Sequence, residues 1–203
     1  MLSDNKFDLY ANIDSHICND EKPSLYLQSL TGDLFMNEEP FAMLSCLKKI
    51  KQSPKYHPEG SVWNHTMLVL DEVAKRKSKA SDSRAFMWAA LLHDIGKAVT
   101  TSKNKKNITA YNHDIVGADL TYVFLSEFEL DKVFINFVTA LVRWHMQILY
   151  VTKDLPQADI KSMKKQVPTN DIALLGLCDR LGRGNVDIRR EMENISIFRS
   201  KVK

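Results

Sequence analysis

Hydrophobic residues along this chain recur at the three- to four-residue spacing of amphipathic helices, while strand-like alternation is almost absent. Only seven glycines and six prolines interrupt the pattern. We therefore predict an all-α fold. The expected helices cover about residues 24–30, 40–51, 62–77, 83–96, 112–128, 131–149, 157–166, 170–182 and 187–200.

Local signals mark where several of these helices begin and end. Ser61 and the cluster Ser81-Asp82-Ser83 predict N-terminal caps, and Gly96 predicts a glycine C-terminal cap. Residues 31–33 (TGD) predict a turn, and residues 52–60 and 97–107 predict loops. Residues 1–38 are weakly patterned. We therefore expect one domain, with residues 1–40 as an N-terminal appendage and 41–203 as the main body.

The composition is that of an ordinary globular protein. The 203 residues are 44% hydrophobic and 26% charged, and the net charge of +3 is too small to indicate nucleic-acid binding by itself. Cys18, Cys46 and Cys178 form no CxxC pair, which favours reduced core thiols. Without a signal-peptide pattern or a long apolar run, we expect a cytoplasmic monomer or small homo-oligomer that binds no membrane.

Five predicted helices carry an imidazole or carboxylate on their apolar stripe, where such a group is costly unless it has a partner. The best-defined example is His93, which continues the stripe of Phe86, Ala89 and Ala90. The residues concerned are His65, His93 with Asp94, His113, His145 and Asp179. One shared metal site would give all of them a partner. Mixed imidazole and carboxylate ligands suit a divalent ion such as Mn, Fe, Co, Ni or Zn.

Each residue alone has a simpler explanation. A single histidine on an apolar stripe is more often a hydrogen-bonded core residue than a ligand. Asp179 has Arg180 and Arg183 close by in sequence, so a buried ion pair is an even alternative. The same anomaly on five helices is much harder to attribute to chance, and this repetition favours the metal site.

The order and spacing of these residues resemble the HD-domain superfamily of metal-dependent phosphohydrolases. The finer resemblance is to the HD region of bacterial tRNA nucleotidyltransferases, the CCA-adding enzymes. It rests on HPEGSVWNHT (57–66), LLHDIGKAVT (91–100) and YNHDIVGA (111–118), and it covers about residues 41–184. It implies an HD-domain helical bundle.

The resemblance also implies roles for single residues. His65, His93, Asp94 and Asp179 match the positions that bind a first metal ion. His113 and His145 match positions that hold a second ion in dinuclear members, with Asp94 bridging. One or two divalent ions, with Mg also possible, are therefore expected. Such ions clamp the attacking and leaving oxygens of a phosphoester.

The expected activity is hydrolysis of a phosphomonoester or phosphodiester by metal-activated water, with Asp94 and Lys97 as catalytic residues. Lys97 and Arg183 are expected to bind the phosphate, although Lys97 could instead be a solvated lysine and Arg183 could pair with acids. The substrate would be a phosphorylated small molecule, a nucleotide, a 2′,3′-cyclic phosphate or an RNA end. No nucleotidyltransferase head or DxD pair is found, so CCA addition is not expected.

Two other functions remain open at this point. One is a noncatalytic HD module that binds a nucleotide or RNA and regulates a partner. The other is a dinuclear-iron HD oxygenase. Retention of every candidate ligand favours the hydrolase over the binding module, but the ligands alone do not distinguish hydrolysis from oxidation.

Overall fold

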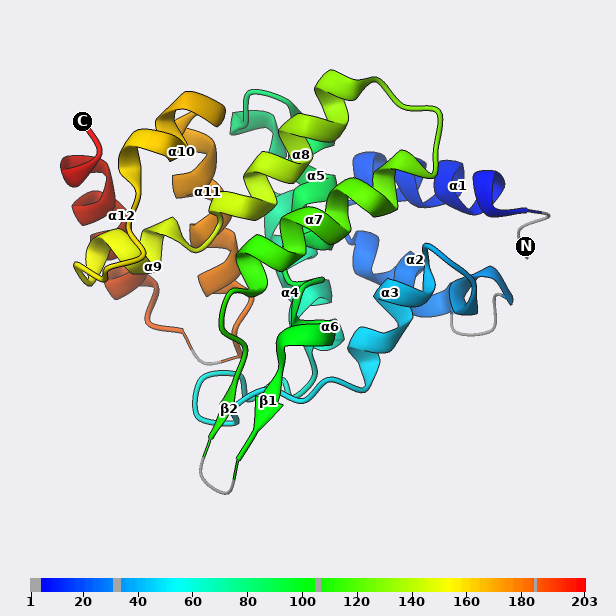
Figure 1. The fold of residues 1–203 in the computed structure, drawn as a ribbon, viewed down its shortest axis with the longest axis horizontal. Helices are drawn as coiled ribbons and strands as arrows, with labels where there is room; N and C mark the ends of the chain where they lie inside the picture. Colours follow the sequence, from blue (N-terminus) through cyan, green and yellow to red (C-terminus); the bar gives the residue numbers. More distant parts are fainter. Residues whose placement is uncertain (1–4, 31–33, 105–106, 185) are drawn as a thin grey trace.

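The computed structural model describes residues 5–30, 34–104, 107–184 and 186–203 (Figure 1). The described part is helical apart from one small hairpin, which confirms the all-α prediction. Among these residues, no helix is both long enough and apolar enough to span a bilayer. The helices are α1 (Lys6–Asn19), α2 (Pro23–Ser29), η2 (Leu34–Asn37), α3 (Ala42–Ser45), η3 (Cys46–Lys48), α4 (Val62–Ala74), η4 (Lys77–Lys79), α5 (Ser83–Leu92), α6 (Lys97–Thr100), α7 (His113–Ser126), α8 (Lys132–Trp144), α9 (Gln147–Thr152), α10 (Ile160–Gln166), α11 (Thr169–Leu181) and α12 (Ile188–Lys201).

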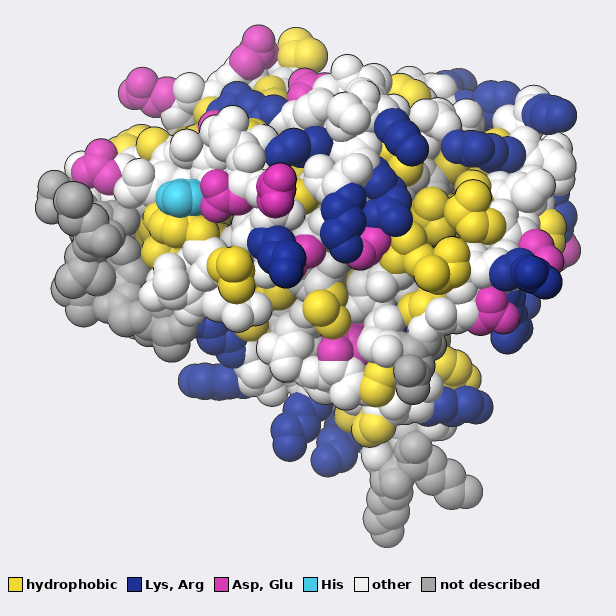
Figure 2. Space-filling view, turned by 180° about the vertical axis from the view of Figure 1, so that it is seen from behind, with side chains coloured by type: hydrophobic (Ala, Val, Ile, Leu, Met, Phe, Trp, Pro, Cys, Tyr) yellow, Lys and Arg dark blue, Asp and Glu magenta, His cyan; other side chains and the backbone are white. Residues whose placement is uncertain are grey.

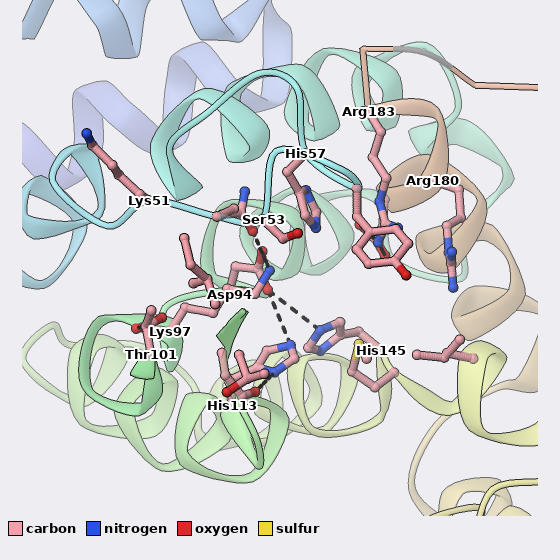
Figure 3. Close-up of a pocket in the computed structure, with 18 of the residues that line it drawn as sticks. Lys51, Ser53, His57, Asp94, Lys97, Thr101, His113, His145, Arg180 and Arg183 are labelled. Carbon is pink, nitrogen blue, oxygen red and sulfur yellow. Dashed lines mark hydrogen bonds and ion pairs between the residues drawn. The ribbon is translucent and has the colours of Figure 1, made fainter. Parts of the chain in front are cut away.

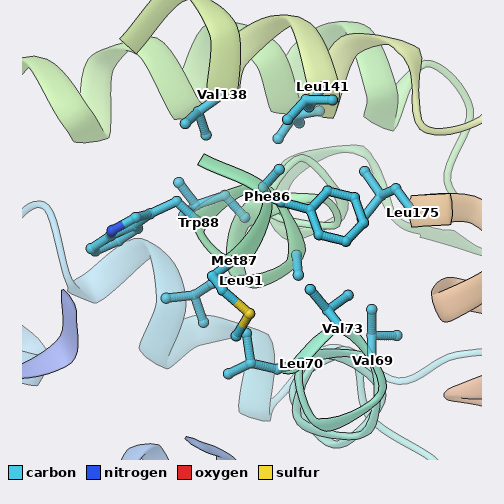
Figure 4. Packing of buried hydrophobic residues seen from close by; sticks show 14 of the residues in the cluster. Val69, Leu70, Val73, Phe86, Met87, Trp88, Leu91, Val138, Leu141 and Leu175 are labelled. Atoms are coloured by element: carbon cyan, nitrogen blue, oxygen red, sulfur yellow. The ribbon is translucent and has the colours of Figure 1, made fainter. Parts of the chain in front are cut away.

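Helix α5 forms the centre of the bundle. Its residues 85–92 are all fully buried, as expected of a helix that is hydrophobic on every side. Leu70 and Val73 of α4 pack on one side of α5, and Val138 and Leu141 of α8 lie on the other (Figure 4). Because α5 is enclosed in this way, the residues that follow its last turn are held inside the protein.

Polar side chains cap the helices that carry the candidate ligands. Ser61 Oγ accepts a hydrogen bond of 3.1 Å from the Asn64 amide at the start of α4. Asp82 Oδ1 accepts one of 2.9 Å from the Ala85 amide at the start of α5. Both caps satisfy a backbone donor that the helix itself leaves free, and both were predicted from the sequence.

The predicted glycine cap at Gly96 is wrong. Helix α5 ends at Leu92, a turn of four residues follows, and the short α6 begins after Gly96. Gly96 has a φ of −62°, so it is not left-handed. A Cβ atom at this position would lie 2.2 Å from the carbonyl oxygen of His113 and 2.6 Å from the amide of Gly117. The glycine is therefore required because the turn passes directly against α7.

The predicted loop 97–107 contains regular structure, and its residues 105–106 lie outside the described part of the chain. It contains α6 and the first strand of an antiparallel hairpin, in which β1 (Ser102–Lys103) pairs with β2 (Ile108–Thr109). The hairpin extends away from the helices at the lower edge of the molecule in Figure 1. The chain between α6 and α7 therefore includes both strands of this hairpin.

Two further predicted helices are interrupted. The segment 131–149 is divided into α8 and α9 by a turn at residues 145–146. The segment 40–51 is reduced to α3 and η3, because its end is extended. The Val62 amide donates to Ile50 O, the Gln52 amide donates to Gly60 O, and Lys51 bridges Ser61. This pairing closes the loop 52–60 at its base.

Helix α1 was missed in the sequence. Its residues Leu9, Ile13 and Ile17 are fully buried in the common hydrophobic core. Tyr10 stacks on Trp88 of α5 with ring centroids 4.9 Å apart. The spacing of its apolar residues is helical, but the charged and polar residues between them obscured the pattern. The predicted turn at residues 31–33 lies outside the described residues.

The burial of α1 makes the proposed appendage 1–40 testable. We expect Ile13→Ala to lower the free energy of unfolding of the whole domain by about 2–5 kcal/mol, because it removes a fully buried side chain. Urea unfolding followed by circular dichroism measures this loss. Ser15→Ala, on the exposed face of α1, is the control and should change stability little. An unchanged main transition in Ile13→Ala would mean that α1 is energetically separate from the rest.

Candidate metal centre

Six buried side chains from five segments meet beside a cavity of about 530 Å³, and four of them, Asp94, His113, His145 and Asp179, line it. Figure 3 shows Asp94, His113 and His145 at this cavity. They come from the middle of α4, the turn after α5, the start of α7, the turn after α8, and the end of α11. They are the residues singled out in the sequence, namely His65, His93, Asp94, His113, His145 and Asp179.

The Asp94 carboxylate lies at the centre of this group. Its Oδ1 atom is 3.4 Å from His113 Nε2 and 3.9 Å from His145 Nε2. Its Oδ2 atom is 3.4 Å from His93 Nε2 and 2.6 Å from Lys97 Nζ. Each of these three imidazoles therefore directs the same ring nitrogen toward one carboxylate.

The other nitrogen of each of these three rings is held by the backbone. His93, His113 and His145 place Nδ1 at 2.7–2.8 Å from the carbonyl oxygen of the residue three positions earlier. A carbonyl only accepts, so Nδ1 carries a proton and Nε2 of the neutral ring keeps its lone pair. His93 and His145 directly follow helices and use carbonyls near the helix ends, where such groups lack a helical partner.

His113 reaches the same arrangement at the start of a helix. Asn112, just before it, has a φ of +59°, a left-handed conformation that asparagine tolerates better than most residues. The chain then turns into α7 with the His113 ring directed back to the carbonyl of Ala110. The contact of Gly96 with the first turn of α7 holds this ring next to Asp94.

Two of these imidazoles have no partner for their inward nitrogen. His93 Nε2 and His113 Nε2 are buried and make no hydrogen bond with any residue that the structure describes. Leaving such a buried polar atom unsatisfied is costly. Because the free atoms are neutral lone pairs facing a carboxylate, they fit the ligand set of a divalent metal ion.

The ligand atoms fall into two sets that could each hold an ion. His65, His93 and Asp179 form one set, and Asp94, His113 and His145 form the other. Within each set the ligand atoms lie within 4.8 Å of one another. Asp94 Oδ2 is also 3.9 Å from His65 Nε2, so this carboxylate borders both sets.

His65 is oriented by a residue that the sequence analysis did not assign. Its Nε2 atom is 2.9 Å from Asp179 Oδ1, and its Nδ1 atom is 2.9 Å from Glu59 Oε1. Glu59 Oε1 also contacts His57 Nδ1 at 2.8 Å. The HPEG segment thus supplies a carboxylate behind His65, in the manner of carboxylates that orient histidine ligands in metal sites. The only signal was the position of Glu59 in that motif.

The electrostatics favour charged carboxylates at Asp94 and Asp179 and neutral rings at His113 and His145. Burial opposes the charge of Asp94, but the Lys97 ammonium favours it, and the pKa of this carboxyl lies well below its usual range. For Asp179, Arg183 and His65 have the same effect against burial and also lower its pKa. Burial, followed by the nearby His113 and His93, lowers the pKa of His145 to about 3. These protonation states are those that metal ligation requires.

The contact between His65 and Glu59 shifts the pKa of both residues. Burial opposes protonation of His65, but its contacts with Asp179 and Glu59 prevail and raise its pKa. Burial also disfavours the charge on Glu59, yet its contact with His65 and a backbone hydrogen bond lower the pKa of Glu59 to about 2. Charged partners therefore surround His65, whereas the His145 ring stays neutral beside the charged Asp94 carboxylate.

The predicted phosphate-binding side chains line the same cavity. Lys97 is largely buried and donates to Gln52 Oε1 at 2.8 Å as well as to Asp94, so it is not a solvated lysine. Arg183 contacts both oxygens of Asp179, at 3.4 and 3.3 Å, which agrees with the ion-pair alternative. Both side chains nevertheless face the cavity (Figure 3).

The remaining polar residues of the motifs occupy distinct places. His57 lines the cavity, and burial, with Lys97 nearby, lowers its pKa to about 4. Asp114 is directed elsewhere and accepts a hydrogen bond of 2.9 Å from Arg143. His16 lies in α1, where it pairs with Asp20 at 2.8 Å.

The comparison with protein families agrees with this geometry. The HD domain family matches residues 62–183, which is more than half of the chain and includes all six clustered residues. The chain belongs to the HD domain family. The predicted HD-domain helical bundle is thereby confirmed.

Curated relatives share the same region at modest identity. The multifunctional CCA protein of Hahella chejuensis is 28% identical over 125 residues, and that of Pasteurella multocida is 31% identical over 127 residues. Each match covers 62% of this chain, but only 28% and 30% of the respective relative. The multifunctional CCA protein of Shewanella frigidimarina is 38% identical over 64 residues, 32% of this chain and 14% of that protein. The chain therefore spans less than a third of the length of these relatives.

The position of Glu59 predicts an effect on metal affinity. We expect Glu59→Gln to weaken Mn²⁺ binding by about tenfold, because the charge behind His65 that increases its basicity is lost. Competition with a chelating dye measures the affinity. Glu193→Gln, the same change on the exposed face of α12, is the control. Equal affinities for Glu59→Gln and the unmodified protein would contradict a role for Glu59 in orienting a ligand.

Proposed function

We propose that this protein is a metal-dependent phosphohydrolase that cleaves a phosphomonoester or phosphodiester. Its substrate would be a nucleotide, a 2′,3′-cyclic phosphate or an RNA end. The observation that carries the proposal is the pair of buried, unpartnered Nε2 atoms of His93 and His113 facing the Asp94 carboxylate. Leaving two such atoms without hydrogen bonds is costly, and a bound metal ion would give both of them a partner.

We assign the metal ligands from the two donor sets. His65, His93, Asp94 and Asp179 would hold a first ion, and His113, His145 and the shared Asp94 would hold a second. When bound, such ions polarise phosphoryl oxygens and lower the pKa of water, which supplies the attacking group. The proton on each outer Nδ1 keeps the ring nitrogens that face the ions in their ligating form.

Two cationic side chains would act on the substrate directly. The Lys97 ammonium lies at the edge of the carboxylate cluster, so it could contact a phosphoryl oxygen and stabilise the charge that develops on it. Arg183 presents a planar guanidinium to the same cavity and could bind a second phosphate oxygen. Gln52 and Asp179 keep these two cations in position.

The names of the relatives support an RNA-related substrate. They are called multifunctional CCA proteins, and the region that they share with this chain is the one that holds the candidate ligands. A cavity of about 530 Å³ is also of the size that proteins use for small ligands, with room for a nucleotide. We therefore place phosphorylated nucleosides and RNA ends before other phosphoesters.

The double substitution His93→Ala with Asp94→Ala tests the site. We expect it to remove bound divalent metal and to reduce phosphoester turnover to background, because it deletes one ligand and the shared carboxylate. Plasma emission measures the metal content. Turnover is followed with 3′-mononucleotides and 2′,3′-cyclic nucleotides in the presence of Mn²⁺, Ni²⁺, Co²⁺ or Mg²⁺.

The matched control for this experiment is His16→Ala with Asp20→Ala, a surface histidine–aspartate pair remote from the cavity. It should retain both metal and turnover. Activity that survives in the His93/Asp94 variant would refute the proposed site. Metal-loaded protein that binds nucleotides but turns over no phosphoester would instead indicate the regulatory function, and iron-dependent oxidation would indicate the oxygenase.

Lys97→Ala tests the proposed catalytic cation. We expect kcat to fall by roughly 100-fold with metal content unchanged, because a donor that stabilises transition-state charge is lost. Steady-state kinetics and plasma emission on the same preparation separate these effects. Lys103→Ala, on the exposed strand β1, should have normal kinetics. Unchanged kcat in Lys97→Ala would return this lysine to a purely structural role.

A further inference from the structure

A second cavity of about 470 Å³ adjoins the one that contains the candidate metal centre. The two cavities share lining residues from the loop 52–60, α9, the end of α11 and the first turn of α12. The shared residues are Tyr56, Leu149, Lys153, Arg180, Arg183 and Arg190. We call the combined space the groove. It leads from the buried carboxylates to the start of α12.

The groove contains a cation without an acceptor. Arg180 is half-buried, yet its side chain makes no hydrogen bond or ion pair with any residue that the structure describes. A partly desolvated guanidinium next to another cation is unfavourable unless an anion comes to it. Arg180 and Arg183 extend side by side toward the cavity in Figure 3.

The acids around Arg180 are engaged with other groups. Asp179 contacts Arg183 and His65. Asp187 caps α12 by accepting from the Arg190 amide at 3.2 Å, and Glu191 accepts from Asn194 at 3.0 Å. Asp179 and Glu191 thus act on Arg180 only through their charge, and no described residue accepts a hydrogen bond from its guanidinium, which can donate to a ligand in the groove.

Aromatic and aliphatic surface lies beside these cations. Tyr56 lines both cavities and is 58% exposed. Leu149 and two prolines of the loop 52–60 contribute further apolar wall. Single-stranded nucleic acid is bound by this combination, in which guanidinium groups contact phosphates and aromatic rings stack on bases.

The grouping of cations is a local property of the groove. The whole chain has a net charge of only +3. On the face shown in Figure 2, Lys and Arg side chains lie among acidic and hydrophobic ones. The second cavity of the groove is lined by five cations, Lys55, Lys153, Arg180, Arg183 and Arg190, and by only two acids, Asp187 and Glu191.

We propose that the groove binds the nucleotide next to the reacting phosphate, so that the protein prefers the end of a single-stranded oligonucleotide to a free nucleotide. Arg180 and Arg190 would bind the adjoining phosphodiester, and Tyr56 would stack on a base. The inference rests on the proposed function for the position of the reacting phosphate. The binding itself depends only on the groove.

Binding by fluorescence anisotropy tests the groove independently of catalysis. The probe is a fluorescein-labelled hexaribonucleotide that ends in a 3′-phosphate, and the competitor is the corresponding 3′-mononucleotide. We expect the hexamer to bind at least about tenfold more tightly. Arg190→Ala and Tyr56→Ala, both at exposed positions, should each weaken hexamer binding about fivefold or more and leave mononucleotide binding unchanged.

Arg189→Ala is the matched control, because Arg189 is an exposed neighbour on α12 that lines neither cavity. It should bind the hexamer normally. Equal affinity for the hexamer and the mononucleotide would overturn the inference. An equal loss in Arg189→Ala and Arg190→Ala would also overturn it, since binding would then reflect only the net charge of α12.

Turnover separates this inference from the proposed function. Hydrolysis with the same kcat/KM for the mononucleotide and the hexamer would refute the groove and leave the phosphohydrolase proposal standing. Length-dependent binding that requires Arg190, without turnover of any phosphoester, would refute the phosphohydrolase proposal and leave the groove standing. A kcat/KM that rises with length and falls in Arg190→Ala would support both.

Discussion

The carboxylate of Asp94 is the group on which the arrangement of this protein depends. It is buried against three imidazole nitrogens and one ammonium group, and a charge in such a place is tolerated only when its surroundings are complementary. Those surroundings come from four segments of the chain. Helix α5 must therefore end inside the bundle, and the start of α7 and the end of α8 must lie close to that end. The packing of the helices therefore determines which groups surround the Asp94 carboxylate in the cavity.

The same contact orients all three inner histidines at the ends of helices. Two of the inner histidines directly follow a helix and one begins a helix, and each binds a backbone carbonyl with its outer nitrogen. The helices stop where they do partly because these carbonyls are used by side chains. Gly96 then lets the turn after α5 lie against α7 without a side chain between them. The ends of α5 and α8 and the start of α7 therefore direct the three imidazoles toward Asp94.

Much of this organisation could be predicted from the sequence. Periodicity identified the all-α class, Ser61 and Asp82 marked helix starts, and polar residues on apolar stripes identified the side chains that meet in the cavity. Long-range contacts account for what was missed. The pairing of Ile50 with Val62 shortens one helix, and the approach of α7 to Gly96 replaces an expected glycine cap. Local patterns do not encode such contacts, and the same is true of Glu59, whose role depends on the position of His65.

The two halves of the cluster differ in how their geometry is maintained. His93, His113 and His145 are oriented by main-chain carbonyls, which no substitution of the accepting residue removes. His65 is oriented by the side chain of Glu59, which a single codon change can replace. The first half should therefore persist through long sequence divergence within the family. The second half offers evolution a single position, Glu59, at which the orientation of His65 can change while the fold remains intact.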